Sequence, residues 1–368
     1  MVTASKANYD NATWNDITDT ATNSTGPVAK KSATISFASS SVTINYGESA
    51  KNTLTNTGDG TVSYTSSNTN VATINSTTGE VTIKQAGTTT IKAKVADVAY
   101  YTYSTKTISY TLTVKKITNP AKVSPVTGIV YGETKAMVSA TGVQGTIYYS
   151  TETELTEANY LSKGSQDIPS SSGRDAGTYN IYYYVTGNSN YNAASNTSST
   201  PVKTTIGKAT NPIAITSPQS WTPTFSTSAQ TKAITAATGG QGSVTYAIKS
   251  QKNSSGTAVT NFTLSGTTVT MAASTSVGTY TVVITATAAG NSNYNSGSKD
   301  ITLNVTVGKA TNPISITSPQ SWTPTFSTSA QTKAITGATG GQGSVTYAIK
   351  SQKNSSGTAV TNFTLSGT

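Results

Sequence analysis

Hydrophobic and polar residues alternate with a period of two along much of the chain. Residues 300–307 show this pattern, and residues 107–114 repeat it. The apolar positions are Ile301, Leu303, Val305 and Val307 in the first segment, and Ile108, Tyr110, Leu112 and Val114 in the second. A period of two predicts a β-strand with one buried and one solvated face. The nearest approach to a helical pattern, residues 152–163, has too few leucines for more than one helical turn.

A long internal repeat organises the chain. Residues 207–267 recur as residues 308–368, at an offset of 308 − 207 = 101 positions. The two copies differ only at Ala214 against Ser315 and at Ala236 against Gly337. The second copy has no counterpart of residues 268–307, which include two predicted buried strands. We therefore expect residues 308–368 to be loose, unfolded or completed by another chain.

A shorter motif, Lys-x-Thr-Asn-Pro, marks the junctions between repeats. It occurs at residues 116–120, 208–212 and 309–313, and with Lys31 as the earliest junction the spacings are 85, 92 and 101 residues. The Asn-Pro step restricts the backbone and suits a short linker between consecutive domains.

These junctions predict five segments. The first is expected to hold the closing strands of a preceding, truncated domain, because residues 2–9 resemble residues 185–191. Three complete domains follow, and the last segment is a truncated second copy of the third complete domain. The predicted segments are 1–30, 31–116, 117–207, 208–307 and 308–368.

A glycine turn followed by tyrosine precedes two of the predicted strands. The sequence is Ala-Gly-Thr-Tyr up to Tyr179 and Val-Gly-Thr-Tyr up to Tyr280. We interpret both tyrosines as tyrosine corners of immunoglobulin-like (Ig-like) sandwiches, in which the hydroxyl bonds to nearby backbone. Ile181 and Val282 would then occupy the position of the disulfide cysteine in antibody domains. The alternative is an ordinary turn before a strand.

Three segments resemble known domain families. Residues 32–116 resemble the group 2 bacterial Ig-like domains of intimin- and invasin-type proteins through three motifs. These are Tyr-Thr-Ser-Ser-Asn-Thr-Asn-Val-Ala-Thr-Ile from residue 64, Gly-Glu-Val-Thr from residue 79 and Ala-Gly-Thr from residue 86. Residues 117–207 and 208–307 are similar to Ig-like and cadherin-like tandem repeats of bacterial surface proteins. The resemblance implies an extracellular stalk or adhesive array.

Charge and composition exclude several classes of function. The net charge is +10 and the isoelectric point is about 9.4, but Arg174 is the only arginine, so we expect no nucleic-acid footprint. The chain has no His and no Cys, which removes the usual ligands of zinc, haem and iron–sulfur groups and the usual bases of hydrolases. We therefore expect no enzyme activity, no catalytic residue, no cofactor and no metal.

Carboxylates are too scattered to suggest a site. Asp300 is the only acid in residues 207–307, which excludes a glycosidase pair or a calcium site there. Two denser groups are interpreted as solvated loops: Asp10, Asp16 and Asp19, and Glu152, Glu154 and Glu157. A lysine–asparagine isopeptide crosslink is a further hypothesis, with Lys208, Asn304 and Asp300 as its participants.

Aromatic residues offer the candidate ligand contacts. Tyr182 and Tyr184 share one strand face, and Tyr101 belongs to a second cluster with Tyr100 and Tyr103. Such rings can stack on sugars, and they also pack across strands. Trp221, which has its copy at Trp322, follows the linker; we predict that it is more than half buried and contacts the preceding domain.

The predicted fold class is all-β, a tandem array of Ig-like antiparallel β-sandwiches. The predicted function is a non-catalytic stalk or adhesion segment of a bacterial cell-surface or secreted protein. The alternatives are a bacteriophage virion protein, and accessory carbohydrate-binding domains of a secreted polysaccharide-degrading enzyme. We expect an extracellular or cell-surface location, a host-surface protein or glycan and the neighbouring Ig-like domains as partners, and no membrane insertion within this segment. No signal peptide begins the sequence.

Overall fold

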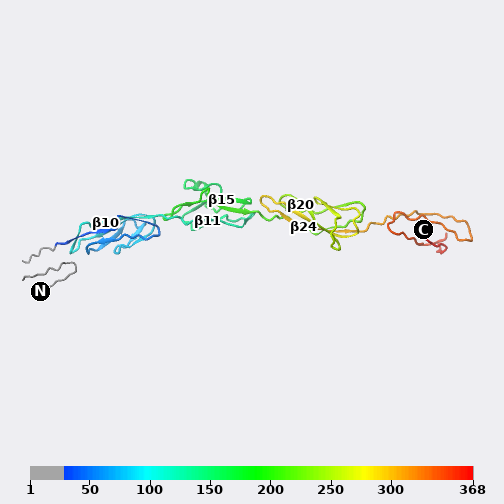
Figure 1. The fold of residues 1–368 in the computed structure, drawn as a ribbon, viewed down its shortest axis with the longest axis horizontal. Helices are drawn as coiled ribbons and strands as arrows, with labels where there is room; N and C mark the ends of the chain where they lie inside the picture. Colours follow the sequence, from blue (N-terminus) through cyan, green and yellow to red (C-terminus); the bar gives the residue numbers. More distant parts are fainter. Residues whose placement is uncertain (1–28, 368) are drawn as a thin grey trace, which may run out of the picture. The chain divides into compact units, whose positions relative to one another are not determined.

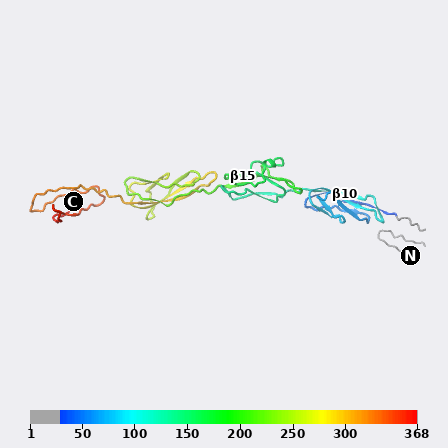
Figure 2. The same cartoon turned by 180° about the vertical axis from the view of Figure 1, so that it is seen from behind.

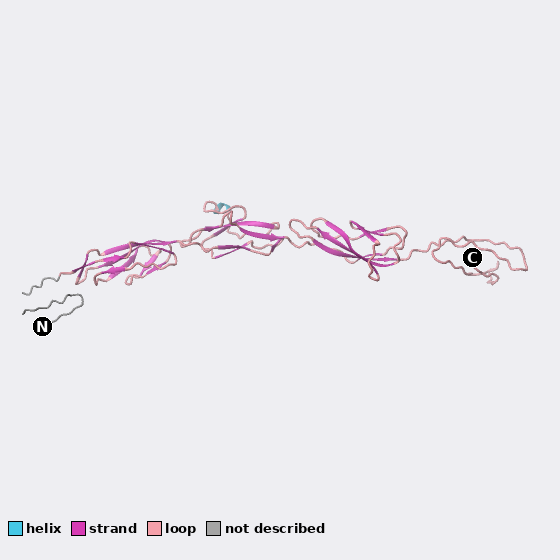
Figure 3. Ribbon diagram, in the orientation of Figure 1, coloured by secondary structure: helices cyan, strands magenta, loops and turns pink. Residues whose placement is uncertain are grey.

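The computed structural model describes residues 29–367 of the chain. Strands dominate the described residues, and the single α-helix among them has four residues (Figure 3). Contacts group the chain into two compact units. Unit 1 is Met1–Ile129, Thr134–Ser172 and Thr178–Thr205; unit 2 is Val130–Glu133, Gly173–Gly177 and Ile206–Thr368. The fold is all-β, with several β-sheet domains, as the alternation predicts.

The first sandwich is built around a four-stranded sheet in the order β3-β10-β8-β5. Its strands are β3 (Ser41–Asn45), β10 (Thr107–Lys115), β8 (Gly87–Val95) and β5 (Val62–Ser66), and β10 is labelled in Figure 1. Three two-stranded sheets complete it: β1 (Lys31–Ala33) with β9 (Tyr101–Tyr103), β2 (Ile35–Phe37) with β4 (Leu54–Asn56), and β6 (Ala72–Ile74) with β7 (Val81–Ile83). Ile91, Tyr110 and Leu112 are buried between them.

The second sandwich has the sheet order β12-β17-β15-β14, with β16 paired to β15. These strands are β12 (Ile129–Val130), β17 (Val202–Gly207), β15 (Gly177–Val185), β14 (Ile147–Ser150) and β16 (Ala194–Ser195). A two-stranded sheet joins β11 (Lys122–Pro125) to β13 (Val138–Thr141). Between β14 and β15 the chain forms α1 (Tyr160–Lys163), which matches the single helical turn expected for residues 152–163.

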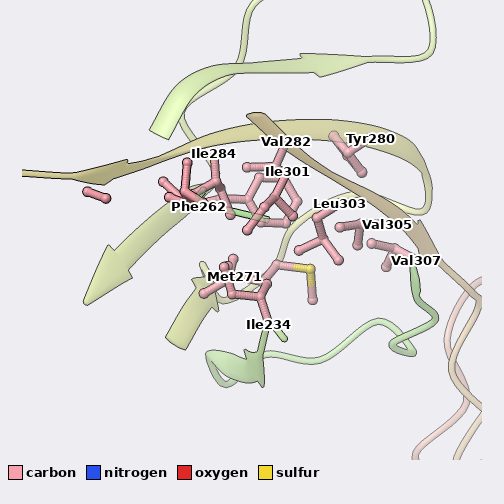
Figure 4. Packing of buried hydrophobic residues seen from close by; sticks show 14 residues of the cluster. Ile234, Phe262, Met271, Tyr280, Val282, Ile284, Ile301, Leu303, Val305 and Val307 are labelled. Carbon is pink, nitrogen blue, oxygen red and sulfur yellow. The ribbon is translucent and has the colours of Figure 1, made fainter. Parts of the chain in front are cut away.

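The third sandwich packs the sheet β18-β24-β23-β20 against the sheet β19-β22-β21. The first sheet holds β18 (Gln219–Trp221), β24 (Gly297–Val307), β23 (Gly278–Ala288) and β20 (Val244–Asn253). The second holds β19 (Gln230–Ala233), β22 (Thr268–Met271) and β21 (Phe262–Ser265). Figure 4 shows the inner faces meeting, with Phe262 and Met271 opposite the aliphatic side chains of β23 and β24.

The two alternating segments form the strands they predict. All four apolar residues of 301–307 are buried on β24, and Tyr110, Leu112 and Val114 are buried on β10. Ile181 and Val282, placed by the corner motif on inner faces, are also fully buried. The periodicity therefore predicted which side chains form the cores.

Two edge pairs in these antiparallel sandwiches are parallel, a detail that the sequence did not predict. β3 pairs with β10 in parallel, and β18 pairs with β24 in parallel. In each sandwich an early edge strand lies beside the final strand and runs in the same direction, which makes that one pair parallel. The remaining neighbours in these two four-stranded sheets are antiparallel.

Residues 308–367 form no strand, although their sequence repeats that of the third sandwich (Figure 3). Large apolar side chains are left in solvent; Phe326, for example, is 97% exposed. The counterparts of β23 and β24, which supply much of the third core, are missing from this copy. Within residues 308–367 no side chain is fully buried, so the described segment has no hydrophobic core of its own.

Candidate functional site

Three tyrosines cluster over the second sandwich. Tyr148 and Tyr184 are directly paired across β14 and β15, and Tyr160 of α1 covers them. The rings of Tyr160 and Tyr184 are stacked, 4.8 Å apart at 15°, while Tyr148 meets Tyr160 edge-on at 4.9 Å. Figures 1 and 2 show, from opposite sides, the excursion that carries α1 projecting beside β15. The cluster is a packed aromatic patch built by one loop closing on a sheet.

The loop that carries Tyr160 is held by an asparagine. Asn159 Oδ1 accepts a hydrogen bond from Thr156 N at 2.8 Å, and Asn159 Nδ2 donates to Glu154 O at 3.0 Å. Glu154 in turn accepts from Ser198 N. The acidic loop predicted from Glu152, Glu154 and Glu157 thus supports the tyrosine cluster.

The predicted ligand contact Tyr184 is largely covered by this packing. Its residue is 7% exposed, and one face of its ring is against Tyr160. Burial, together with the charge of Glu157 and the neighbouring Tyr160, raises the pKa of Tyr184. Since stacking on a sugar requires an open ring face, little of Tyr184 remains for a ligand, whereas Tyr182 on the same strand is only partly buried.

The other aromatic cluster divides into structural and surface residues. Tyr103 is buried, accepts from Gly60 N at 2.9 Å and donates to Asn56 Oδ1 at 2.8 Å. Tyr101 is partly buried against the same small core. Tyr101 is therefore the member of this cluster that combines partial exposure with a fixed ring.

The first sandwich contains a pocket that the sequence analysis missed. It has a volume of about 520 Å³ and is lined by Phe37, Tyr64 and Tyr110 together with polar residues such as Lys51 and Glu80. Burial raises the pKa of both Tyr64 and Tyr110. The lining residues come from separate strands and loops, so no local sequence motif predicts the pocket.

Charged groups in residues 29–367 do not assemble a metal or crosslinking site. Within this range, no three His, Cys, Asp or Glu side chains gather as metal ligands would. Asp300 accepts from Lys249 and Thr285, which holds its pKa below the ordinary value. The Lys208 ammonium instead donates to Asn291 O at 2.7 Å. Lys208 and Asp300 thus have hydrogen-bond partners other than Asn304, and Asp10, Asp16 and Asp19 lie outside the described residues.

Tyr280 has the geometry that the tyrosine-corner interpretation requires. Its hydroxyl donates to Ser276 O at 2.9 Å, four residues upstream, and its ring meets Phe262 edge-on at 5.6 Å. Tyr179 is partly buried at the equivalent place, two residues after the glycine that begins β15. Each corner would fix the turn that leads into the central strand of its sandwich.

Replacing Tyr280 by Phe tests this corner. The change keeps the ring contact with Phe262 and removes only the hydroxyl. We expect the free energy of unfolding of the third sandwich to fall by about 0.5–1.5 kcal/mol, near the lower value because water can reach the exposed Ser276. The change in unfolding free energy is measured by urea unfolding of the third sandwich, with hydrogen exchange of the β23 amides as the probe. An unchanged unfolding free energy would show that the hydroxyl has no structural role.

Trp221 is more than half buried, as predicted, but its neighbours differ from the expectation. It packs against the core of its own sandwich, which includes Leu303 and Val305, and it pairs with Val305 across β18 and β24. The expected contact with the preceding domain was wrong. The indole faces inward because Trp221 is directly paired with the buried Val305, and paired residues on neighbouring strands lie on the same face of the sheet.

One part of the chain is similar to a known domain family. Residues 45–97 match the family described as "Intimin, immunoglobulin-like domain". The match spans β4 to β8 of the first sandwich and supports the expectation of a bacterial Ig-like domain. Intimin Ig-like domains are found on bacterial outer-surface proteins.

A search of curated proteins found no match. Among the described residues, no helix is long and apolar enough to cross a membrane.

Solved structures with tandem domains show only a weak likeness. Drosophila N-cadherin EC1-4 is 12% identical, with 75% of each chain covered and a TM-score of 0.27. Sidekick-1 immunoglobulin domains 1-5 are 11% identical, covering 75% of this chain and 59% of that one, with a TM-score of 0.22. A SusE-like surface-located polysaccharide-binding protein from Bacteroides thetaiotaomicron is 12% identical, with coverages of 76% and 54% and a TM-score of 0.20.

Proposed function

We propose that the chain is a non-catalytic stalk or adhesion segment of a bacterial cell-surface or secreted multidomain protein. The observation that carries this proposal is the intimin Ig-like match of residues 45–97 within a series of β-sandwiches. The group 2 assignment of residues 32–116 and the division into domains 31–116, 117–207 and 208–307 belong to the same proposal. The grouping of strands into three sandwiches supports that division.

The side chains agree with a passive role. Buried polar side chains bond to the backbone of their own sandwiches. Asn119 and Asn211 donate to turn carbonyls, and Thr204 donates to the carbonyl of Met137. In the described part of the chain, no buried polar side-chain atom lacks a hydrogen-bond partner. A catalytic site usually leaves such groups available to a substrate.

Tyr182 and Tyr101 are the proposed ligand contacts of this segment. Both rings are partly exposed and lie on strands, so their positions are fixed before a ligand arrives. Aromatic rings held in this way suit the flat face of a sugar or an aromatic side chain of a surface protein.

Immunogold labelling of the source organism tests the proposal. The probe is an antibody raised against the third sandwich, and the control is the same organism with the coding sequence deleted. We expect label on the outside of intact cells, lost after brief protease treatment. Label confined to the cytoplasm would overturn the proposal, and label on purified phage particles would favour the virion alternative.

A further inference from the structure

Two loops with the sequence Gly-Asn-Ser-Asn-Tyr have the same internal structure. They are residues 187–191 in the second sandwich and 290–294 in the third. In the first loop Asn188 Oδ1 accepts from the amides of Asn190 and Tyr191, at 2.9 and 3.0 Å. The second loop repeats both bonds, with Asn291 Oδ1 accepting at 2.9 and 3.0 Å. The first asparagine therefore fixes the loop, and the second asparagine and the tyrosine are presented outward.

Each loop is also bonded to the linker that enters its sandwich. Ile117 N donates to Asn190 O at 3.0 Å, and Ala209 N donates to Asn293 O at 2.8 Å. The buried linker asparagines, Asn119 and Asn211, donate to the carbonyl that follows each loop. Linker and loop therefore form one preorganised end of each sandwich.

The second asparagine of each loop contacts a turn of the sandwich that precedes it in sequence. Asn190 Oδ1 accepts from Ala86 N at 2.9 Å, within unit 1. Asn293 Oδ1 accepts from Ala176 N at 2.8 Å, within unit 2. Both alanines immediately precede the glycine that begins a long central strand, β8 or β15. The same acceptor thus meets the same donor position at two places in the chain.

The tyrosine of each loop adds a second contact to the same preceding sandwich. Tyr191 lies 6.1 Å from Tyr46 at 69°, and Tyr294 lies 5.4 Å from Tyr131 at 72°, both edge-to-face. Tyr46 and Tyr131 are equivalent, because the amide of each donates to a carbonyl at the end of its sandwich's last strand. Both joints thus share a hydrogen bond to an Ala-Gly turn and an aromatic pair, and in the second joint Asn293 Nδ2 also donates to Asp175 Oδ1 at 2.8 Å.

A third surface of this kind exists at the end of the third sandwich. Phe225 occupies the place of Tyr46 and Tyr131, since its amide donates to Gly308 O at 2.8 Å. Val277 precedes Gly278, which begins β23, and so occupies the place of Ala86 and Ala176. Val277 is 48% exposed, and within residues 29–367 its amide has no protein acceptor.

The linker that follows this surface has the same internal hydrogen bond as the linker that enters the third sandwich. Asn312 donates to Gln342 O at 3.0 Å, as Asn211 does to Gln241 O. Residues 308–368 contain no Gly-Asn-Ser-Asn-Tyr loop, and the two loops found in residues 29–367 are both engaged. We call the surface formed by Phe225 and Val277 the third receptor. Neither loop of residues 29–367 is available to occupy it, so its occupant would be a loop of another domain.

We propose that the third receptor is a docking surface for another Ig-like domain that carries a Gly-Asn-Ser-Asn-Tyr loop. The second asparagine of that loop accepts a hydrogen bond from the Val277 amide, and its tyrosine packs edge-on against Phe225.

Amide hydrogen exchange of the full chain, followed by NMR, tests the rule in the two joints that are present. Asn190→Ala should speed exchange of the Ala86 amide by up to ~10-fold, the effect of one net hydrogen bond, and leave Ala176 unchanged. Asn293→Ala should do the reverse, so each variant is the control for the other. Unchanged exchange at both alanines would overturn the assignment of the asparagines, provided that amides of β15 and β23 remain protected.

A lengthened chain tests the third receptor. A second copy of residues 268–307 is fused after Thr368, which supplies the loop in its natural setting. We expect the Val277 amide to exchange up to ~10-fold more slowly than in the chain of 368 residues, and the gain to be lost when alanine replaces the counterpart of Asn293 in the extension. An unprotected Val277 in a lengthened chain whose added strands are protected would refute the proposal.

Discussion

Replacing Phe262 by Ala is expected to destabilise the third sandwich by about 3–5 kcal/mol. Phe262 is 1% exposed and lies among the aliphatic side chains of β23 and β24 (Figure 4). Removing its ring takes away apolar contacts and leaves a cavity that the surrounding strands can fill only in part. Urea unfolding followed by hydrogen exchange of β23 and β24 amides measures the loss.

The chain contains a matched control for this substitution. Phe363 is the repeat counterpart of Phe262, at 262 + 101, and it lies in the same local sequence. The Gln352 side chain donates to the carbonyl of Phe363 and accepts from its amide, as the Gln251 side chain does for Phe262. Phe363 is nevertheless 54% exposed, because the second copy lacks the strands that would cover it. Phe363→Ala should change the unfolding free energy by no more than about 0.5 kcal/mol.

Equal effects of the two substitutions would contradict the structure. They would mean that residues 308–367 bury Phe363 as the complete sandwich buries Phe262. The comparison separates local sequence from tertiary context, because everything within several residues of the substituted position is the same in both copies.

The same pair of copies shows what the sequence can predict about this fold. The period-two pattern predicted β24 and β10 and their buried residues, because a strand's inner face must be apolar wherever it packs. It could not predict that β18 pairs in parallel with β24. Strand pairing depends on where the chain enters and leaves a sandwich, and the alternation is the same for either direction.

The candidate surfaces were predicted less completely, for a different reason. Tyr184 alternates like an exposed residue, but Tyr160 lies 24 positions earlier in sequence and covers it through a loop with no periodic signal. The place of Trp221 after the linker predicts a contact with the preceding domain. In the structure, the edge strand β18 packs Trp221 against the core of the third sandwich. The repeated Gly-Asn-Ser-Asn-Tyr motif was visible in the sequence, but only the bonds of its second asparagine indicate a joint.

Replacing Gly242 by Ala is the second substitution with a large expected effect. Gly242 has a φ of +81°, where a side chain is strained by about 1–2 kcal/mol. An added Cβ would also lie 2.1 Å from Gly290 O, closer than any stable contact. Because that atom belongs to backbone, the collision must move the chain and should cost about 1–3 kcal/mol more. We expect the third sandwich to lose roughly 2–5 kcal/mol, the sum of these two costs.

The difference between Gly242→Ala and Gly343→Ala isolates the cost of the collision. Gly343 is the repeat counterpart of Gly242 and has a similar φ of +84°, but an added Cβ would meet nothing within 4 Å. Its substitution carries the backbone strain alone. Since Gly290 begins the loop that presents Asn293, Gly242→Ala should also speed exchange of the Ala176 amide, and Gly343→Ala should not. If both variants leave Ala176 protected, the loop tolerates the displacement and the close approach of Gly242 to Gly290 is not what positions the joint.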